Sequence, residues 1–267
     1  MSERLSRLKG ALRMVDICAM RQSSFEKLIK ELDELRKDSY DLQFISALAP
    51  EHAGRLIELL SKSRAQLHQD LFVLAQLAFK TNGYFVEFGA ASGVHLSNTY
   101  LLEKKFSWNG ILAEPAQCWH ADLKSNRSCR IDTDCVWKES NVCLTFQEAE
   151  VAELSKIENS AACDHDIDQH EIRKAYLVKS ISLMDLLRKY QAPAIIDYLS
   201  VDTEGTEYEI LSGFDFERYQ FRVITCEHNF GPGRDPVRSL LSKFGYVRKF
   251  EHLSKFDDWY VHPELLP

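Results

Sequence analysis

An apolar run that ends in an acid and continues into two glycines, residues 84–93, limits the possible folds more than any other part of the chain. A buried strand of a parallel sheet, a tight turn and a helix produce this order of residues, and we expect that helix over 96–105. Gly89 allows a sharp turn after the strand. Gly93 is expected to let the loop lie close to a ligand, because glycine has no side chain to obstruct it.

The spacing of the two glycines disfavours a dinucleotide. The loop reads E-x-G-x-x-x-G, and Ala91 stands where the dinucleotide fingerprint has its second glycine. Such a loop suits a nucleoside that carries an amino-acid tail and no pyrophosphate, such as S-adenosylmethionine. A glycine pair after a strand is also common as a simple tight turn. If the loop binds a cofactor, the expected contacts are Glu87, Gly89, Ala90, Ser92 and Gly93.

Strands and helices alternate along the chain from residue 65 onward. Apolar runs predict strands at 84–88, 110–113, near 135–137, 195–201 and 221–227, and helices at 65–80, 182–190, 206–212 and 236–244. Two further strands, near 246–250 and 258–261, follow without a helix between them and predict an antiparallel pair at one edge. The expected fold is α/β, a mostly parallel sheet with helices on both faces.

Residues 1–65 have a different pattern and are expected to form a helical extension to a main domain of residues 66–267. Three short helices are indicated by an apolar stripe over 5–15, a capping box of Ser23 and Glu26, and Pro50 at a helix start. We expect this extension to form a homodimer or contact a partner. The basic first helix also fits an anionic membrane surface.

Composition excludes several classes of protein. The net charge of -7 disfavours broad nucleic-acid binding through phosphates. The seven cysteines form no CxxC pair, as expected of free thiols in a reducing cytosol. No apolar run approaches the ~20 residues of a membrane span, and no signal-peptide core follows Met1. We therefore expect a cytoplasmic protein.

A polar stretch from Glu153 to Lys174 interrupts the alternation. Acids and histidines crowd within it at Asp164, His165, Asp166, Asp168, His170 and Glu171. Their spacing matches no metal-ligand motif, so a solvated loop or a substrate lid is favoured over a metal site.

Glu114 closes the second predicted strand. An acid at this place commonly binds a ribose diol, because one carboxylate accepts hydrogen bonds from two hydroxyls. The same acid also fits the start of a helix before Pro115. With Glu114 on the ribose, Glu87 is expected near the ammonium end of the cofactor. Lys138, Glu139 and Ser140, after the third strand, are expected at the adenine edge.

The next two strand ends are expected to meet at one crevice. Asp202 ends the fourth strand and Glu227 the fifth, with His228 and Asn229 following, and open α/β sheets bind ligands at such ends. Asp202 and Glu204 also fit helix N-caps. Two mechanisms remain open for a hydroxyl acceptor. His228 acts as general base, or Asp202, Glu227 and Asn229 hold a divalent cation such as Mg²⁺ that lowers the pKa of the hydroxyl.

From about Gln66 to the C-terminus the sequence resembles the FkbM family of S-adenosylmethionine-dependent methyltransferases. The resemblance is carried by blocks at 69–74, 86–90, 97–99, 110–115, 126–127, 197–207, 227–229 and 259–261. It implies a class I methyltransferase fold, Rossmann-like, whose seven-stranded sheet has an antiparallel last strand. It also implies O-methylation, commonly of sugar hydroxyls in surface glycans, as in polysaccharide biosynthesis, or of natural products.

Catechol O-methyltransferase, a distant relative in fold, binds magnesium at the ends of its fourth and fifth strands. Asp202, Glu227 and Asn229 fall at matching places here, although Glu227 replaces an aspartate and His228 intervenes. Three hypotheses follow from the resemblance and the residues. The protein methylates a sugar hydroxyl, with Asp202, Glu227 and His228 as catalytic residues. Alternatively it methylates a polyketide or another natural product, or it is a nucleoside-binding scaffold without turnover.

Overall fold

The computed structural model describes residue 27 and residues 29–31, 34–158 and 172–267. Packing divides the chain into two units, Met1–Pro50 and Glu51–Pro267. In the first unit, residues 34–47 are helical, whereas the stripe over 5–15 and the Ser23–Glu26 capping box lie outside the described residues. The helix expected at Pro50 is present as η1 (Pro50–His52) and α2 (Ala53–Leu60). The domain boundary after residue 65 and the homodimer remain predictions.

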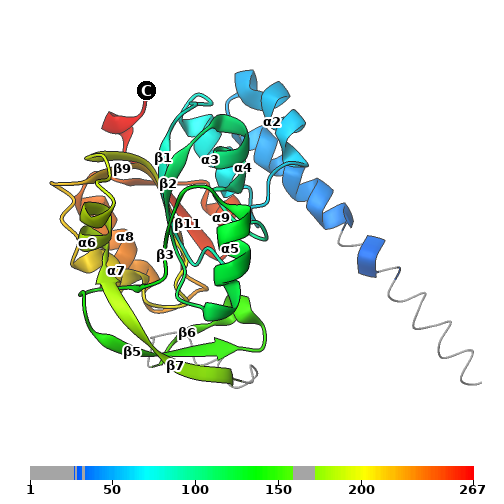
Figure 1. The fold of residues 1–267 in the computed structure, drawn as a ribbon. Helices are drawn as coiled ribbons and strands as arrows, with labels where there is room; N and C mark the ends of the chain where they lie inside the picture. Colours follow the sequence, from blue (N-terminus) through cyan, green and yellow to red (C-terminus); the bar gives the residue numbers. More distant parts are fainter. Residues whose placement is uncertain (1–26, 28, 32–33, 159–171) are drawn as a thin grey trace, which may run out of the picture. The chain divides into compact units, whose positions relative to one another are not determined.

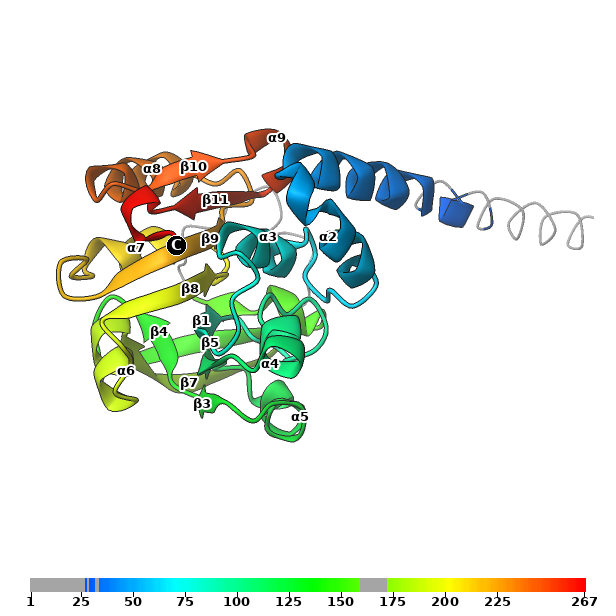
Figure 2. The same ribbon diagram turned by 90° about the horizontal axis from the view of Figure 1, so that it is seen from above.

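The second unit is built on a mixed, mostly parallel sheet. Among the described residues, seven strands form this sheet in the order β10-β11-β9-β8-β1-β2-β3 (Figures 1 and 2). They are β1 (Tyr84–Phe88), β2 (Asn109–Ala113), β3 (Arg130–Asp132), β8 (Ile195–Val201), β9 (Gln220–Glu227), β10 (Val247–Lys249) and β11 (Asp257–Val261). β11 runs antiparallel to both β9 and β10, and the other pairs are parallel. The expected class I methyltransferase fold is confirmed.

Helices cover both faces of this sheet, as Figure 1 shows. One face carries α6 (Leu183–Lys189), α7 (Glu207–Ser212) and α8 (Arg234–Lys243), and the other α3 (Gln69–Gln76), α4 (Tyr100–Phe106) and α5 (His120–Asn126). Side chains alternate along a strand. Val86 and Phe88 of β1 accordingly join the apolar cluster under α6 to α8, whereas Phe72 of α3 stacks on Trp259 of β11 across the other face. The core thus lies on both sides of one sheet, and the ends of its strands are available for a site.

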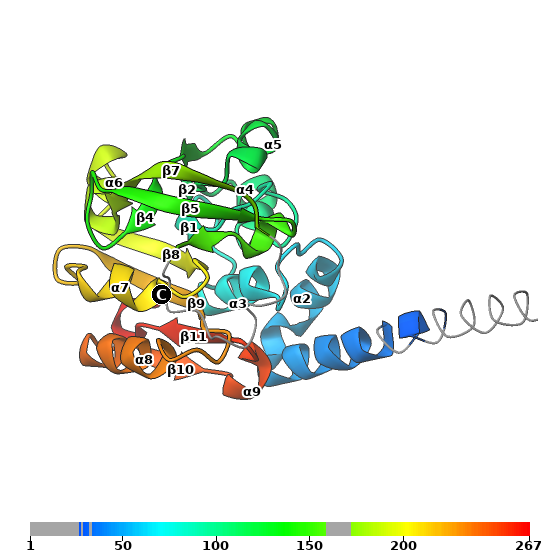
Figure 3. The same cartoon turned by 90° about the horizontal axis from the view of Figure 1, so that it is seen from below.

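A second, smaller sheet was not expected. Among the described residues it holds four strands, β4 (Cys135–Trp137), β7 (Ile172–Ser182), β5 (Cys143–Ala149) and β6 (Lys156–Ile157), in that order. The strand predicted near 135–137 exists, but it belongs to this sheet, and the third strand of the main sheet is β3. Figure 3, from the side of the small sheet, shows β5 and β7 across the ends of β1 and β8.

Two predicted helices are shorter than expected because left-handed residues border them. α3 occupies only part of 65–80, since His68, Ala78 and Phe79 have φ of 59°, 50° and 56°. Leu96 has φ of 56°, and α4 begins only at Tyr100. A short helix, α9 (Glu251–Ser254), lies between the last two strands. In the described part of the chain, every helix is too short or too polar to cross a membrane.

Candidate active site

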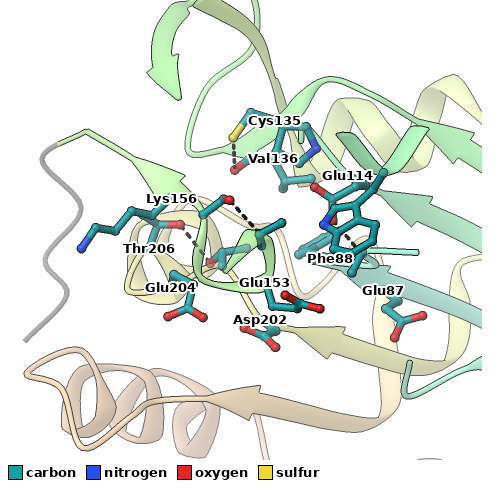
Figure 4. A pocket seen from close by; sticks show the side chains of 18 of the residues that line it. Glu87, Phe88, Glu114, Cys135, Val136, Glu153, Lys156, Asp202, Glu204 and Thr206 are labelled. Atoms are coloured by element: carbon teal, nitrogen blue, oxygen red, sulfur yellow. Dashed lines mark hydrogen bonds between the residues drawn. The ribbon is translucent and has the colours of Figure 1, made fainter. Parts of the chain in front are cut away.

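A cavity of about 870 Å³ lies between the main sheet and the small sheet. Its floor is formed at the carboxyl ends of β1, β2 and β8, and its roof by β5, β6 and the η3 turn (Ala152–Leu154). Figure 4 shows Glu204, Asp202 and Glu87 along one wall, with Cys135 and Val136 of β4 across from them.

Gly89 is required by the approach of two strand ends. Its φ is 69°, and a Cβ at this position would overlap the carbonyl oxygen of Asp202. The missing side chain therefore lets β1 and β8 end side by side, and it leaves Gly89 on the cavity wall. Ala91 also lines the cavity, while the Ser92 hydroxyl accepts from His95 N and the Ala90 carbonyl accepts from Gly93 N, within the loop.

A glycine is needed at position 93 for a reason other than the expected approach of a ligand. A Cβ there would lie 2.6 Å from Cδ1 of Leu123 and 2.7 Å from Cγ of Arg127. The loop at Gly93 lies against α5 and the residue after it, and Gly93 is not among the residues that line the cavity. The glycine thus serves packing between loop and helix, and the ligand-facing residues are the earlier ones, Gly89 and Ala91.

Glu114 lies where the sequence placed it, on the wall of the cavity just after β2. Oε2 accepts a 2.7 Å hydrogen bond from Ala91 N, and Oε1 accepts a 2.8 Å bond from Ala116 N. Burial raises the pKa of the carboxyl to about 7. Each oxygen has two lone pairs, so both retain acceptor capacity for hydroxyls of a ligand.

Glu87 organises the loop between the glycines and α4. Its carboxylate accepts from Asn98 N at 2.7 Å and from the hydroxyls of Ser97 and Thr99. Arg127, whose side chain is fully buried, donates to Ser97 Oγ, Thr99 Oγ1 and the Gly93 carbonyl. Burial raises the pKa of Glu87, against the effect of Arg127. Glu87 borders the cavity, but its oxygens are used to hold this loop.

The expected adenine-edge residues lie elsewhere. Ser140 Oγ donates to Asp185 Oδ2 at 2.6 Å, at the start of α6. The Glu139 side chain is exposed, and its carbonyl accepts from Ser180 Oγ. Neither residue lines the cavity, whereas Cys135 and Val136 of β4 do. The displacement follows from the strand assignment, because the residues were counted from β4 as if it belonged to the main sheet.

Asp202 and Glu227 come together as expected from their strand ends. Their carboxyl groups hydrogen-bond one another, and burial raises the pKa of Asp202 to about 6. The pKa of Glu227 is raised further, by burial and by the charges of Asp202 and Glu204. Two buried carboxyl groups this close do not both ionise readily, so the pair retains a proton more strongly than an isolated acid does.

A third acid, Glu204, joins this pair. One carboxylate oxygen each from Asp202, Glu204 and Glu227 lies within 4.8 Å of the others, a spacing that suits a cation. The N-cap alternative for Asp202 and Glu204 is not what the structure has, since Thr206 is the N-cap of α7. Asn229, the third expected metal ligand, lies in the loop after β9, where its backbone N donates to the Phe256 carbonyl.

His228 faces away from both carboxylates. Its Nδ1 accepts a 2.9 Å hydrogen bond from Phe230 N, so the proton resides on Nε2, which lies 3.6 Å from Oδ1 of Asp258. Only 3% of its side chain is exposed, and burial lowers its pKa. His228 lines neither of the cavities found in the described part of the chain.

Several lining residues were missed by sequence reasoning. Trp119, Phe146 and Ile157 supply apolar surface on the side of the cavity near Cys135 and Val136. Asn98 borders the cavity next to Glu87, and its Nδ2 donates to Ser200 Oγ at 2.9 Å. Trp119 could have been recognised from the sequence, as a large aromatic residue shortly after Pro115. The roof residues could not, because β5 and β6 have no regular apolar period.

Comparison with known protein families identifies the family of this chain. Residues 87–253, more than half of the chain, match the family model described as the Methyltransferase FkbM domain. The chain belongs to this family of methyltransferases. The match runs from Glu87 to Leu253, so it includes Glu114 and Asp202 of the cavity and also Glu227.

Solved structures with a similar fold include another FkbM protein. Methyltransferase FkbM from Methylobacillus flagellatus KT is 12% identical, with 85% of this chain and 60% of that chain covered and a TM-score of 0.45. Precorrin-6y C5,15-methyltransferase from Geobacter metallireducens GS-15 is 11% identical, with 67% and 72% covered and a TM-score of 0.39. The METTL16 MTase domain is 12% identical, with 73% and 66% covered and a TM-score of 0.43. No curated protein matches the sequence.

Membership of the FkbM methyltransferases implies S-adenosylmethionine as methyl donor, and the cavity fits this group. Acids outnumber bases among its lining residues, with Glu87, Glu114, Glu153, Asp202 and Glu204 against Lys156. This balance suits a ligand that carries a positive sulfonium and an ammonium. Trp119, Val136 and Phe146 offer apolar surface on which a purine would pack, and Glu114 would accept hydrogen bonds from ribose hydroxyls.

Proposed function

We propose that this protein transfers the methyl group of S-adenosylmethionine to a hydroxyl of a neutral sugar, in a glycan or a glycosylated product. The observation that supports this most is the position of Asp202. It lies on the cavity wall beside Gly89 and hydrogen-bonds a second acid, Glu227. A carboxylate at this place provides a proton acceptor within the site, which an alcohol needs before its oxygen is a useful nucleophile.

Asp202 and Glu227 have different roles in the proposed mechanism. Asp202 ionises first and accepts the proton of the acceptor hydroxyl. Glu227 retains its proton and donates a hydrogen bond to Asp202. S-adenosylmethionine supplies a methyl carbon on a sulfonium, so the new O–C bond forms as the C–S bond breaks and the electron pair stays on sulfur. The rate comes mostly from holding the oxygen in line with that carbon.

A cation is the second candidate for activating the hydroxyl. Asp202, Glu204 and Glu227 offer three carboxylates within 4.8 Å, and hard oxygen ligands suit Mg²⁺. A bound cation would lower the pKa of the acceptor hydroxyl and would ionise Glu227 as well. Both versions of the mechanism require Asp202, and they differ in their response to a chelator.

Methyl transfer from labelled S-adenosylmethionine to a panel of neutral glycosides tests the proposal. We expect an O-methylated sugar, identified by mass spectrometry, with loss of transfer in Asp202→Asn but not in Asp235→Asn, an exposed acid on α8. Without a metal, transfer should survive EDTA and should fall as the pH is lowered through about 6, because Asp202 becomes protonated there. Abolition by EDTA with rescue by Mg²⁺ would favour the cation. Cofactor binding without transfer to any glycoside would contradict the proposal.

A further inference from the structure

A second cavity, of about 360 Å³, adjoins the first beyond Asp202. Leu96, Asn98 and Asp202 line both cavities, so these side chains form the wall between them. The second cavity is built from the other side of the molecule. Its residues come from the segment before α3, from β8 and β9, and from the start of β11.

This second cavity contains polar atoms that the protein leaves without partners. Oδ1 of Asp257 and Oδ1 of Asn98 are both buried and, among the described residues, have no hydrogen-bond partner. The residue Asp257 is only 3% exposed. A buried polar atom without a hydrogen-bond partner destabilises the folded protein, and beside a cavity it marks a position where a ligand group can supply the partner.

The neighbouring contacts fix both side chains in place. Oδ2 of Asp257 accepts from Gln69 Nε2 at 3.0 Å and from Trp259 Nε1 at 3.1 Å, which leaves Oδ1 as the oxygen without a partner among the described residues, on a residue that lines the cavity. The Gln69 oxygen is also used, because it accepts from Leu67 N at 2.9 Å. The Asn98 amide nitrogen donates to Ser200 Oγ. The atoms left without partners are therefore the Asn98 amide oxygen, an acceptor, and Oδ1 of Asp257, which carries the carboxyl proton when Asp257 is protonated and can then both donate and accept.

We infer that the second cavity is the acceptor subsite, in which Asp257 and Asn98 receive hydroxyl groups of a neutral sugar. This inference rests on the proposed function, since it names where the acceptor of that reaction lies. Three carboxyl groups, of Asp202, Glu227 and Asp257, disfavour an anionic ligand. Leu96, Val201 and Phe256 give the same cavity an apolar side, which matches the C–H face of a sugar ring.

The shared wall explains how the two ligands meet. Asp202 borders the cavity that fits S-adenosylmethionine and also the subsite with Asp257. A ligand in either cavity therefore lies next to the same proton acceptor, Asp202.

Gln66 provides a test that leaves the core untouched. This residue lines the second cavity, is exposed, and does not line the first. Gln66→Trp should obstruct the subsite, and Gln66→Ala is its matched control. Asp257→Asn is the second variant. Gln69 and Trp259 will hold its amide oxygen in place of Oδ2, so an N–H group, which can only donate, replaces an oxygen that can also accept.

The measurement is binding, so that it does not depend on turnover. Methyl glycosides of glucose, mannose, galactose and rhamnose are titrated by saturation-transfer NMR into full-length protein saturated with S-adenosylhomocysteine. Affinity for S-adenosylmethionine is measured separately by calorimetry. We expect Gln66→Trp and Asp257→Asn to weaken glycoside binding by about tenfold or more, the factor for one lost hydrogen bond of ~1.4 kcal/mol. Affinity for the cofactor should be unchanged, and Gln66→Ala should behave as wild type.

Four results would overturn the inference. Wild type that binds no glycoside is one, and glycoside binding that both variants retain is another. The third is a loss of cofactor affinity in Gln66→Trp, which would assign the cavity to the methionine end of the cofactor. The fourth is binding of 2-amino-2-deoxyglucose but of no neutral glycoside, because the cavity would then select a positively charged ligand. Glycosides that bind through this subsite but are never methylated would support the subsite and contradict the proposed function alone.

Discussion

The backbone nitrogen of Ala91 lies 2.7 Å from Oε2 of Glu114, and this hydrogen bond ties the loop after β1 to the end of β2. The other oxygen, Oε1, holds Ala116 N at 2.8 Å. One carboxylate thus sets the spacing of two chain segments and still faces the cavity. An amide cannot do this, because it has only one oxygen.

Glu114→Gln is therefore expected to weaken the binding of S-adenosylmethionine by ~10-fold or more, since one N–H would face an N–H and a charged acceptor would be lost. Calorimetric titration measures the effect. Glu139→Gln is the matched control, because Glu139 is exposed and lies outside the cavity. Equal weakening in both variants would contradict the placement of the ribose at Glu114.

Gly89→Ala should destabilise the fold. Its φ of 69° is unfavourable for alanine, and the new Cβ would overlap the Asp202 carbonyl oxygen. The backbone alone costs ~1–2 kcal/mol, and the overlap adds to this. Urea unfolding followed by circular dichroism checks the prediction. Gly54→Ala is the control, since Gly54 lies in α2 with no atom within 4 Å of the added Cβ, and there alanine should stabilise by ~0.5–1 kcal/mol. Similar effects at both positions would be evidence against the close approach of β1 and β8.

Arg127→Met should cost ~3–5 kcal/mol of unfolding free energy, because it leaves buried acids without their cation. The guanidinium Nε donates to Glu103 at 2.6 Å, and its side chain is fully buried. Arg188→Met is the control. Its pair with Asp185 is about half exposed, and exposed pairs contribute only ~0–1 kcal/mol. If the two variants unfold at the same urea concentration, the buried network does not have the role assigned to it.

The stability of the protein should depend on pH through Asp257. Burial raises its pKa from 3.8 to about 8. Between these values the folded carboxyl keeps a proton that the unfolded chain releases. The free energy of unfolding therefore falls as the pH rises, by at most ~1.4 kcal/mol per pH unit for this group.

Asp257→Asn removes this dependence. The unfolding free energy of the variant, minus that of wild type, should increase from pH 5 to about pH 8 and then level off. Urea unfolding across that range measures the difference, with Asp235→Asn as a control whose curve should run parallel to wild type. A constant difference between Asp257→Asn and wild type would show that Asp257 is ionised throughout.

The central part of the fold was predictable because buried parallel strands appear as continuous apolar runs. β1, β2, β8 and β9 have this pattern, and each has an acid within one residue of its last position, which the structure brings to one edge. β3 was missed because it is three residues long, with Ile131 as its only large apolar residue. β7 was missed because most of its side chains are exposed, so no alternation marks it.

The position of Asp257 beside the site could not be predicted from the sequence pattern. It pairs with Glu227 in the antiparallel register of β11 and β9, 30 positions along the chain. Nothing local distinguishes it from the adjacent Asp258, which lies on the other face and pairs with Arg234 and Arg248. His228 shows the converse. A histidine between two site residues looked functional, but alternation along the chain turns it toward Asp258 instead.

The two cavities are encoded by different stretches of the chain. The larger one draws on β1, β2 and the insertion that holds β4 to β6, whereas the smaller one draws on the segment before α3 and on β8, β9 and β11. Asp202, Leu96 and Asn98 are common to both. Substitutions around β9 and β11 can thus accumulate during divergence without disturbing the residues around Glu114. An ancestral member could thus change its acceptor specificity while its donor site was inherited unchanged. Only substitutions in the shared wall would affect both cavities at once.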